Sequence, residues 1–268
     1  MRTYAATYIS MLIIAFTWCQ QSMGQSASSA EGLQQIRARE LAQELTHLSQ
    51  QATGMQNSLL DWAILNRYRK ENASLPPPNQ SEHRVVFYGD SATDGWGRVP
   101  GTGEFFPGKP YVNRGISGET TAQCLVRFSQ DVVHLKPEVV ITLAGGNDIA
   151  GNTGPSTPEM IEDNSAAMAA IAKDNGIQFV IASILPASKY GWVPAIQPTG
   201  EIQEVNRWLQ AFCASKGLIY LDYYSALVDA QGGMRSELSA DGVHPNAQGY
   251  AIMAPLAEHA IEQALSRR

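Results

Sequence analysis

The chain has 268 residues, of which 44% are hydrophobic and 16% are charged, and its net charge is -6. This composition excludes a chain that is disordered throughout and fits one large domain with additions. The longest basic cluster is Arg67-Tyr68-Arg69-Lys70. A surface that tracks nucleic-acid phosphates needs far more positive charge, so we expect no nucleic-acid partner.

Residues 1–30 have the pattern of a secretory signal peptide. A basic start precedes an apolar run from Ile9 to Trp18, and small and polar residues follow. The run is shorter than the ~20 residues that span a bilayer, so we expect a secreted or periplasmic protein without stable membrane insertion. Cleavage is expected within residues 24–30. Lipid anchoring at Cys19 is disfavoured, because Trp18 stands where lipoprotein signals carry a small residue.

Residues 31–78 are predicted to form a helical extension followed by a proline-rich linker. Apolar residues recur at helical spacing from Leu33 to Leu48, Gly54 is expected to interrupt the helix, and residues 76–78 are prolines, which cannot continue one. The extension is expected to pack on the main domain or to stay partly mobile. A role in dimerisation or in binding the cell envelope is the alternative, and the oligomeric state is left open.

Beyond the prolines, short β-branched runs alternate with longer helical patterns, which predicts an α/β domain of parallel strands joined by crossover helices. The predicted strands are Arg84–Tyr88, Tyr111–Asn113, Val139–Leu143, Gln178–Ser183 and Leu218–Leu221. The predicted helices are Thr120–Leu135, Pro158–Asn175, Glu201–Lys216 and Asn246–Leu265. Glycine-bearing turns follow the first three strands. Ligands bind at that edge of open parallel sheets, so we expect a site there.

Ser91 is the candidate nucleophile, because an apolar strand delivers it into a glycine-containing turn instead of burying it. A serine hydroxyl attacks only when a base takes its proton and a third group orients that base. Of the five histidines, His244 fits the base best, since a neighbouring glycine and proline place it in a loop before a helix. Asp241 lies three residues earlier and can fold back to the ring. Alone, this Asp-x-x-His pattern would favour a surface loop.

Gly118 and Asn147 follow the second and third predicted strands and are candidate donors to an oxyanion. Gly118 has no side chain, so its N–H can approach a ligand closely, and Asn147 offers an amide donor. Taken singly, each favours a simpler interpretation. Gly118 would form a tight turn, and the Asn147 amide would cap one.

Four segments together resemble the sequence blocks of the SGNH hydrolases, also called GDSL esterases and lipases, including their acetylhydrolase-like and lysophospholipase-like members. In family order they are Gly89-Asp90-Ser91, Ile116-Ser117-Gly118-Glu119-Thr120, Gly146-Asn147-Asp148 and Asp241-Gly242-Val243-His244-Pro245. The resemblance covers roughly Arg84 to the C-terminus, so residues 79–268 are predicted to be an SGNH hydrolase domain. Ala92 departs from the family, which has Leu or Ile after the serine, but this removes no catalytic group.

The resemblance implies a secreted serine esterase that works through an acyl-enzyme. Ser91 would be the nucleophile, His244 the base and Asp241 its orienting acid. The oxyanion hole would consist of the Ser91 N–H, the Gly118 N–H and the Asn147 side chain. The implied fold is three-layer α/β/α and flavodoxin-like, with a five-stranded parallel sheet in the order 2-1-3-4-5. No cofactor and no metal is implied.

The composition and the loop residues indicate the kind of ester. Secretion, an acidic surface and loop aromatics favour short-chain, often acetyl, esters of small molecules or carbohydrates. Candidate pocket walls, about half of which would only pack, are Trp96, Phe105, Phe106, Tyr190 and Trp192. A lysophospholipase-like or thioesterase-like hydrolase is one alternative. A non-catalytic secreted module that binds carbohydrate or the envelope is another.

The implied strand order also bears on the cysteines. It puts the helices after the second, third and fourth strands on one face of the sheet. Cys124 and Cys213 then lie on the first and third of these helices. Neighbouring packed helices are about 8 to 10 Å apart, whereas the Cα atoms of a disulfide lie within ~7 Å. We therefore expect no bridge between them.

Overall fold

The computed structural model describes residues 34–56, 59–79 and 81–267, so the predicted signal peptide lies outside the described residues. The chain divides into two units, Met1–Leu60 and Asp61–Arg268. Residues 61–78 of the predicted extension therefore lie in the same compact unit as the main domain.

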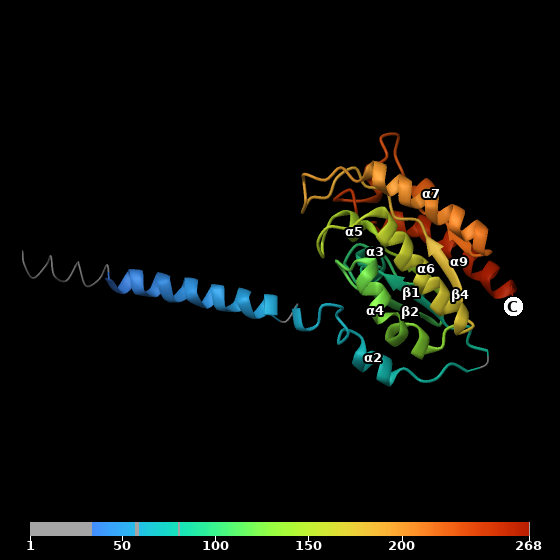
Figure 1. The fold of residues 1–268 in the computed structure, drawn as a ribbon, viewed down its shortest axis with the longest axis horizontal. Helices are drawn as coiled ribbons and strands as arrows, with labels where there is room; N and C mark the ends of the chain where they lie inside the picture. Colours follow the sequence, from blue (N-terminus) through green and yellow to red (C-terminus); the bar gives the residue numbers. More distant parts are fainter. Residues whose placement is uncertain (1–33, 57–58, 80, 268) are drawn as a thin grey trace, which may run out of the picture. The chain divides into compact units, whose positions relative to one another are not determined.

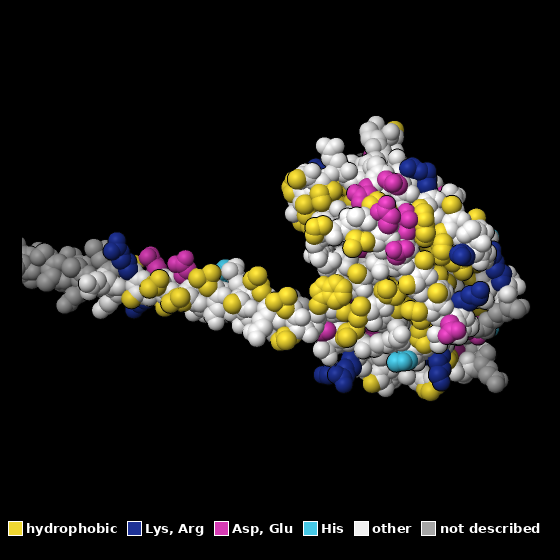
Figure 2. Space-filling model, viewed as in Figure 1, with side chains coloured by type: hydrophobic (Ala, Val, Ile, Leu, Met, Phe, Trp, Pro, Cys, Tyr) yellow, Lys and Arg dark blue, Asp and Glu magenta, His cyan; other side chains and the backbone are white. Residues whose placement is uncertain are grey.

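In the first unit, residues 34–56 are helical and continue through Gly54. The predicted interruption at Gly54 is wrong, because one glycine in an exposed helix costs only about 1 kcal/mol relative to alanine. Hydrophobic side chains lie along this helix (Figure 2), and Ile36, Leu41, Leu45 and Leu48 are exposed. These apolar residues belong to the series whose helical spacing predicted a helix in this segment.

Within the described residues, the second unit is built on a five-stranded sheet in the order β2-β1-β3-β4-β5. The strands are β1 (Val85–Gly89), β2 (Tyr111–Gly115), β3 (Val139–Leu143), β4 (Gln178–Ala182) and β5 (Ile219–Leu221). All neighbouring strands are parallel. Every residue of β1 and β3 is buried, which explains why these strands read as continuous apolar runs.

Helices cover both faces of the sheet (Figure 1). They are α2 (Arg69–Ser74), α3 (Ser91–Asp94), α4 (Thr121–Asp131), α5 (Gly146–Ile149), α6 (Pro158–Asp174), α7 (Thr199–Lys216), α8 (Tyr224–Leu227) and α9 (Ala247–Ser266), with 3-10 turns η1 (Val133–Leu135) and η2 (Ser236–Leu238). On one face α4, α6 and α7 pack side by side, and α9 packs on the other. The predicted α/β/α fold class and strand order are confirmed.

Three of the long helices, α4, α6 and α9, begin at residues whose side chains cap them. Thr120 and Gln123 form a capping box at the start of α4, Thr157 caps α6, and the Asn246 side chain accepts two N–H groups at the start of α9. The helix predicted over Thr120–Leu135 ends at Asp131, because the chain tightens into η1 before reaching strand β3.

The two cysteines of the second unit are buried free thiols, on α4 and on α7 with α6 between these helices. Their positions follow the prediction from strand order. Burial raises the pKa of Cys213 to about 12, and burial also raises the pKa of Cys124. Both thiols therefore stay protonated and unreactive at neutral pH.

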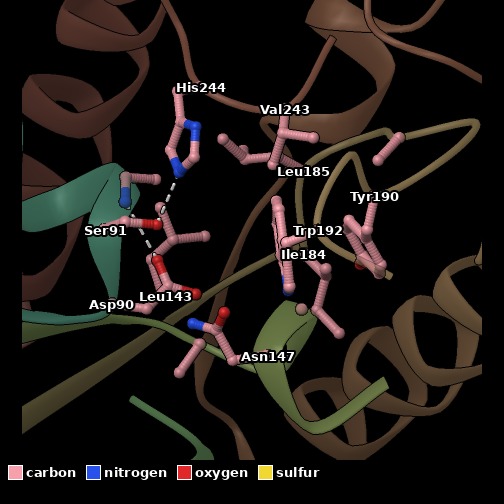
Figure 3. Close-up of a pocket in the computed structure, with 14 residues that line it drawn as sticks. Asp90, Ser91, Leu143, Asn147, Ile184, Leu185, Tyr190, Trp192, Val243 and His244 are labelled. Carbon is pink, nitrogen blue, oxygen red and sulfur yellow. Dashed lines mark hydrogen bonds between the residues drawn. The ribbon is translucent and has the colours of Figure 1, made fainter. Parts of the chain in front are cut away.

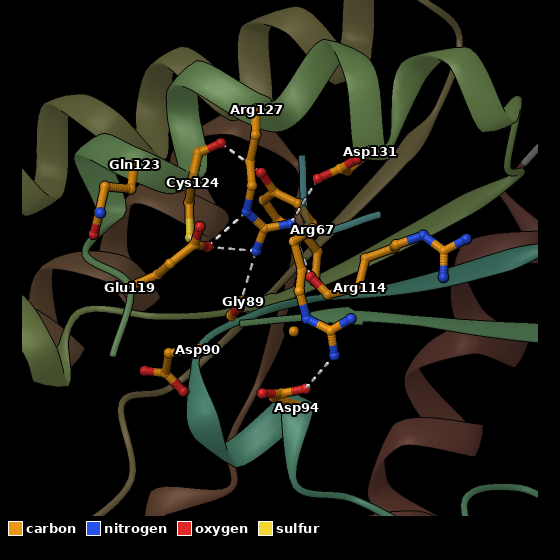
Figure 4. Close-up of polar contacts among 12 residues, drawn as sticks. Arg67, Gly89, Asp90, Asp94, Arg114, Glu119, Gln123, Cys124, Arg127 and Asp131 are labelled. Atoms are coloured by element: carbon orange, nitrogen blue, oxygen red, sulfur yellow. Dashed lines mark hydrogen bonds and ion pairs between the residues drawn. The ribbon is translucent and has the colours of Figure 1, made fainter. Parts of the chain in front are cut away.

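A fully buried arginine joins the ends of two strands (Figure 4). The Arg127 guanidinium lies 2.6 Å from a carboxylate oxygen of Glu119 and 3.2 Å from one of Asp131. It also donates to the carbonyl of Gly89 over 3.1 Å and to that of Arg114 over 2.9 Å. Burial raises the pKa of Glu119 to about 7, and the charge of Arg127 opposes this rise. One side chain thus holds the carboxyl ends of β1 and β2 together.

Replacing this arginine should destabilise the fold strongly. Arg127→Met leaves the Glu119 and Asp131 carboxyls buried without their cation, so we expect the free energy of unfolding to fall by about 3 to 5 kcal/mol. Urea unfolding at neutral pH measures this. The matched control is Arg207→Met on the exposed side of α7, which should change stability by no more than about 0.5 kcal/mol. Equal stability of the two variants would contradict the expectation.

Candidate active site

Ser91 lies at the carboxyl end of β1, where it begins the short helix α3. Gly89 ends the strand with φ +146°, and a Cβ there would lie 1.9 Å from the carbonyl oxygen of Leu143. The close approach of β3 therefore requires glycine at this position. Asp90 caps α3 by accepting the Ala92 N–H over 3.1 Å. The turn holds the Ser91 hydroxyl at the edge of the sheet.

Three of the predicted site residues form one hydrogen-bonded chain. The Ser91 hydroxyl lies 2.8 Å from Nε2 of His244 (Figure 3), and Nδ1 of His244 lies 2.6 Å from Oδ2 of Asp241. The other carboxylate oxygen of Asp241 accepts the N–H groups of Val243 and His244, over 2.9 and 2.8 Å, and the Ser239 hydroxyl over 3.0 Å. With Nδ1 donating to Asp241, Nε2 is free to accept the serine proton.

The Asp241 carboxyl is held in its ionised form. Burial acts to raise its pKa, but hydrogen bonds from the His244 ring and from two backbone N–H groups outweigh burial, so the pKa lies well below its usual range. A carboxylate in this position fixes the tautomer of the imidazole and stabilises its protonated form.

Asn147 and Gly118 lie on neighbouring turns. Asn147 lines the same cavity as Ser91 and His244, and its amide donates to the Glu119 carbonyl over 2.9 Å. Gly118 is not among the residues lining that cavity. It is linked to Asn147 through Asn152, whose amide lies 2.8 Å from Oδ1 of Asn147 and 3.2 Å from the Gly118 carbonyl. Among the described residues, none accepts a hydrogen bond from the N–H of Ser91 or of Gly118.

A cavity of about 40 Å3 opens beside Ser91 (Figure 3). Its apolar walls include Leu143, Ile184, Leu185, Tyr190, Trp192 and Val243. The Trp192 ring stacks on Tyr190 at a centroid distance of 4.9 Å and faces the His244 ring at 6.4 Å. Its Nε1 donates to Asn152 over 3.1 Å. Trp192 thus closes the side of the cavity next to the histidine.

Two of the five aromatic residues predicted as pocket walls, Tyr190 and Trp192, line this cavity. The other three, Trp96, Phe105 and Phe106, only pack, as was expected for about half of the five, and they lie around Phe87 of β1 at ring distances of 5.9, 5.2 and 4.8 Å. The loop between α3 and β2 folds back over the sheet, so its aromatic residues join the core beneath α9.

Two acids and one amide beside the site were assigned no role from the sequence. Burial raises the pKa of Asp90 to about 7, and the Ala92 N–H and the charge of His244 oppose the rise. Burial also raises the pKa of Asp148 to about 6, although this carboxyl accepts the Thr121 N–H and hydroxyl over 2.8 and 2.6 Å. Asn152 follows α5, and no sequence pattern marks it as part of a site. The two acids, by contrast, are adjacent in sequence to Ser91 and Asn147, and this adjacency could have marked them as part of the site.

Within residues 34–56, 59–79 and 81–267, no three His, Cys, Asp or Glu side chains cluster as a metal would require. No helix in these ranges is long and apolar enough to cross a membrane.

Comparison with known sequences assigns the family. The model of the GDSL-like lipase/acylhydrolase family matches residues 87–252, a segment that contains Ser91, Gly118, Asn147, Asp241 and His244. Esterase TesA of Pseudomonas aeruginosa is 30% identical over 138 residues, which are 50% of this chain and 60% of the esterase. The chain thus matches only part of the length of this relative.

Solved structures agree with the sequence match. A proposed acylhydrolase from Bacteroides fragilis is 39% identical, with a TM-score of 0.74 over 76% of this chain and 99% of that chain. A GDSL-like lipase from Bacteroides thetaiotaomicron is 38% identical, with a TM-score of 0.73 over 76% and 100%. An acetylxylan esterase from Geobacillus stearothermophilus, 21% identical with a TM-score of 0.55 over 68% and 94%, shares the fold. The chain belongs to the GDSL-like lipase/acylhydrolase family, a family of carboxylic ester hydrolases.

Proposed function

We propose that this chain is a secreted serine esterase that hydrolyses short-chain carboxylic esters, above all acetyl esters. The observation that carries the proposal is the hydrogen-bonded chain from Ser91 through His244 to Asp241, with distances of 2.8 and 2.6 Å, beside a small cavity. Each link supplies a group that acyl transfer through a serine requires.

In the acylation half of the proposed reaction, Oγ of Ser91 attacks the ester carbonyl while Nε2 of His244 takes its proton. Asp241 stabilises the imidazolium that forms. The negative charge on the carbonyl oxygen is held by the N–H groups of Ser91 and Gly118 and by the Asn147 amide. Each such donor contributes about 3 to 4 kcal/mol to transition-state stabilisation. Collapse of the intermediate breaks the ester C–O bond, and His244 returns the proton to the leaving alcohol.

In the deacylation half, His244 takes a proton from water while the water oxygen attacks the acyl group on Ser91. The same donors hold the second oxyanion. When this intermediate collapses, the carboxylic acid leaves and Ser91 recovers its proton from His244. Every group in the cycle comes from the chain, the ester or water, so the proposal needs no cofactor and no metal.

The cavity supports a short acyl group. A cavity needs roughly 10 to 15 Å3 to hold one water, and the cavity beside Ser91 measures about 40 Å3. It therefore has room for only a few heavy atoms, as in an acetyl group. Trp192 remains 47% exposed beside it, and an aromatic face in this position suits the apolar side of a sugar ring in the alcohol. Carbohydrate acetyl esters thus fit the proposal.

The proposed location is outside the cytoplasm. The apolar run from Ile9 to Trp18, after a basic start, supports a signal peptide over residues 1–30. The proposed hydrolase domain spans residues 79–268, preceded by the extension over residues 31–78.

Removing the nucleophile should abolish activity and leave the fold intact. We expect Ser91→Ala to lower kcat for p-nitrophenyl acetate roughly a millionfold, as for other serine hydrolases, with an unchanged unfolding midpoint. A fluorophosphonate should label the wild-type chain and the control Ser215→Ala, whose serine is exposed on α7, but not Ser91→Ala. Retained turnover in Ser91→Ala would remove Ser91 from the mechanism. An unlabelled and inactive wild-type chain would favour a binding module.

Asp241 should matter as a carboxylate. In Asp241→Asn the amide no longer holds the imidazole in the required tautomer, so we expect kcat to fall roughly ten-thousandfold. Because the pKa of Asp241 is lowered, its carboxylate in the wild-type chain stays ionised and supports the His244 imidazolium at any pH above that pKa. This support is lost only as the pH falls through that pKa. The acid limb of the kcat profile between about pH 4 and pH 9 should therefore not report Asp241. Asp163→Asn, at an exposed position of α6, should leave the profile unchanged.

Trp192 should limit the length of the acyl group. We expect kcat/KM of the wild-type chain to fall from p-nitrophenyl acetate to butyrate to octanoate. Trp192→Ala opens the cavity and should raise the butyrate-to-acetate ratio of kcat/KM about tenfold, the lower end of what pocket contacts with a methylene contribute. Trp208→Ala is the control, since Trp208 stacks on Phe212 in α7. A wild-type preference for octanoate would overturn the acetyl proposal and favour a lysophospholipase-like enzyme.

A further inference from the structure

We infer that Tyr68 and Asp94 are positioning residues that hold the loop between β2 and α4, with Gly118 on it, in place for the oxyanion. This inference rests on the proposed function. Tyr68 belongs to residues 61–75, called the strap below, which precede the segment of residues 87–252 that the family model matches. The strap thus gives this chain a support for its active site from outside the matched segment.

Tyr68 is buried against the end of β2, with 1% of its surface exposed. Its hydroxyl donates to the carbonyl of Gly115, the last residue of β2, and accepts from Nη1 of Arg98 over 2.7 Å. The guanidinium carbons of Arg67, Arg98 and Arg114 lie 4.8, 5.5 and 4.7 Å from the centre of its ring. A neutral phenol surrounded by three cations is therefore fixed in ring position and in hydroxyl direction.

Asp94 continues this contact to the loop. Nη1 of Arg98 lies 2.7 Å from Oδ1 of Asp94. Oδ2 of Asp94 accepts both the N–H and the hydroxyl of Ser117, over 3.1 and 2.8 Å. Ser117 directly precedes Gly118, and Asp94 closes the helix that Ser91 begins. One carboxylate thus ties the helix of the nucleophile to the loop of the oxyanion donor (Figure 4 shows Asp94 below Gly89).

The far side of the loop is held separately. The Gly118 carbonyl accepts from Asn152, and the Glu119 carbonyl accepts from Asn147. Gly118 itself has φ +84° and no side chain to pack. On the near side, Asp94 holds the loop at Ser117 and Tyr68 holds the end of β2 at Gly115, in addition to the ion pair of Arg127 with Glu119. Donors must lie about 2.7 to 3.1 Å from the oxyanion, and a displacement of ~1 Å can cost a hundredfold in rate.

The strap is anchored at other points that do not involve the Tyr68 hydroxyl. Asn72 donates to Asp131 over 2.6 Å and accepts from Arg114 over 2.8 Å. Gln130 of α4 donates to the Leu65 carbonyl over 2.6 Å. Removing one hydroxyl should therefore leave the strap docked, which makes its positioning role separable from its structural one.

The test compares kcat and KM for p-nitrophenyl acetate in Tyr68→Phe, Asp94→Ala and the control Gln130→Ala. Gln130→Ala removes a strap contact away from the loop. We expect kcat to fall roughly tenfold to a hundredfold in Tyr68→Phe and in Asp94→Ala, with KM changed less than about twofold, because a contact made in the transition state is lost. The double variant Tyr68→Phe/Asp94→Ala should lose less than the product of the single effects, since both act on one loop. Gln130→Ala should keep wild-type kcat.

Several results would overturn the inference. These are wild-type kcat in Tyr68→Phe, a change in KM alone, or an equal loss in Gln130→Ala, which would mark a general effect of strap packing. If Asp94→Ala does not fold, Tyr68→Phe decides alone. Ser91→Ala is assayed beside them. Activity in Ser91→Ala would contradict the proposed function. An inactive Ser91→Ala together with a fully active Tyr68→Phe would contradict this inference only.

Discussion

The ion pair of Arg127 with Glu119 is the interaction on which the active-site edge depends. A charge taken out of water costs several kcal/mol unless it is paired and its remaining donors are satisfied. Here the guanidinium meets two carboxylates and the carbonyls of Gly89 and Arg114. Gly89 leads into the turn of the nucleophile, and Glu119 follows Gly118. A change in this one side chain therefore moves both halves of the proposed site.

The parallel sheet sets where these groups can meet. Because β1 lies between β2 and β3, the turns after these three strands open at the same edge. The turns bring Ser91, Gly118 and Asn147 from three separate parts of the sequence. The same crowding demands Gly89, since β3 approaches too closely for any side chain. Fold and proposed chemistry are thus linked through backbone distances as well as through side chains.

A structural feature could be predicted from the sequence where the residues that cause it are close together in the chain. Strand β3 was predicted with its observed bounds, because burial on both faces leaves a continuous run of β-branched and apolar residues. Asp241 and His244 were paired correctly because they lie within one turn. Tyr68 gave no signal, since its partner Gly115 lies 47 residues away and nothing in a basic helical segment marks a buried phenol. Phe105 and Phe106, which pack in the core, could not be told apart from pocket residues, because a position in a loop does not determine which way the loop folds.

Three carboxyl groups around the proposed nucleophile have pKa values pushed in opposite directions, and this separation assigns their roles. Burial raises the pKa of Asp90 to about 7 and that of Asp148 to about 6, so both carboxyls carry less negative charge at neutral pH than an ordinary aspartate does. Asp241 is half exposed and receives several hydrogen bonds, so it stays ionised. Among these three acids, it alone combines a lasting charge with contact to the ring. The imidazolium formed in the proposed reaction is therefore stabilised from one side, and its other nitrogen keeps the proton for the leaving group.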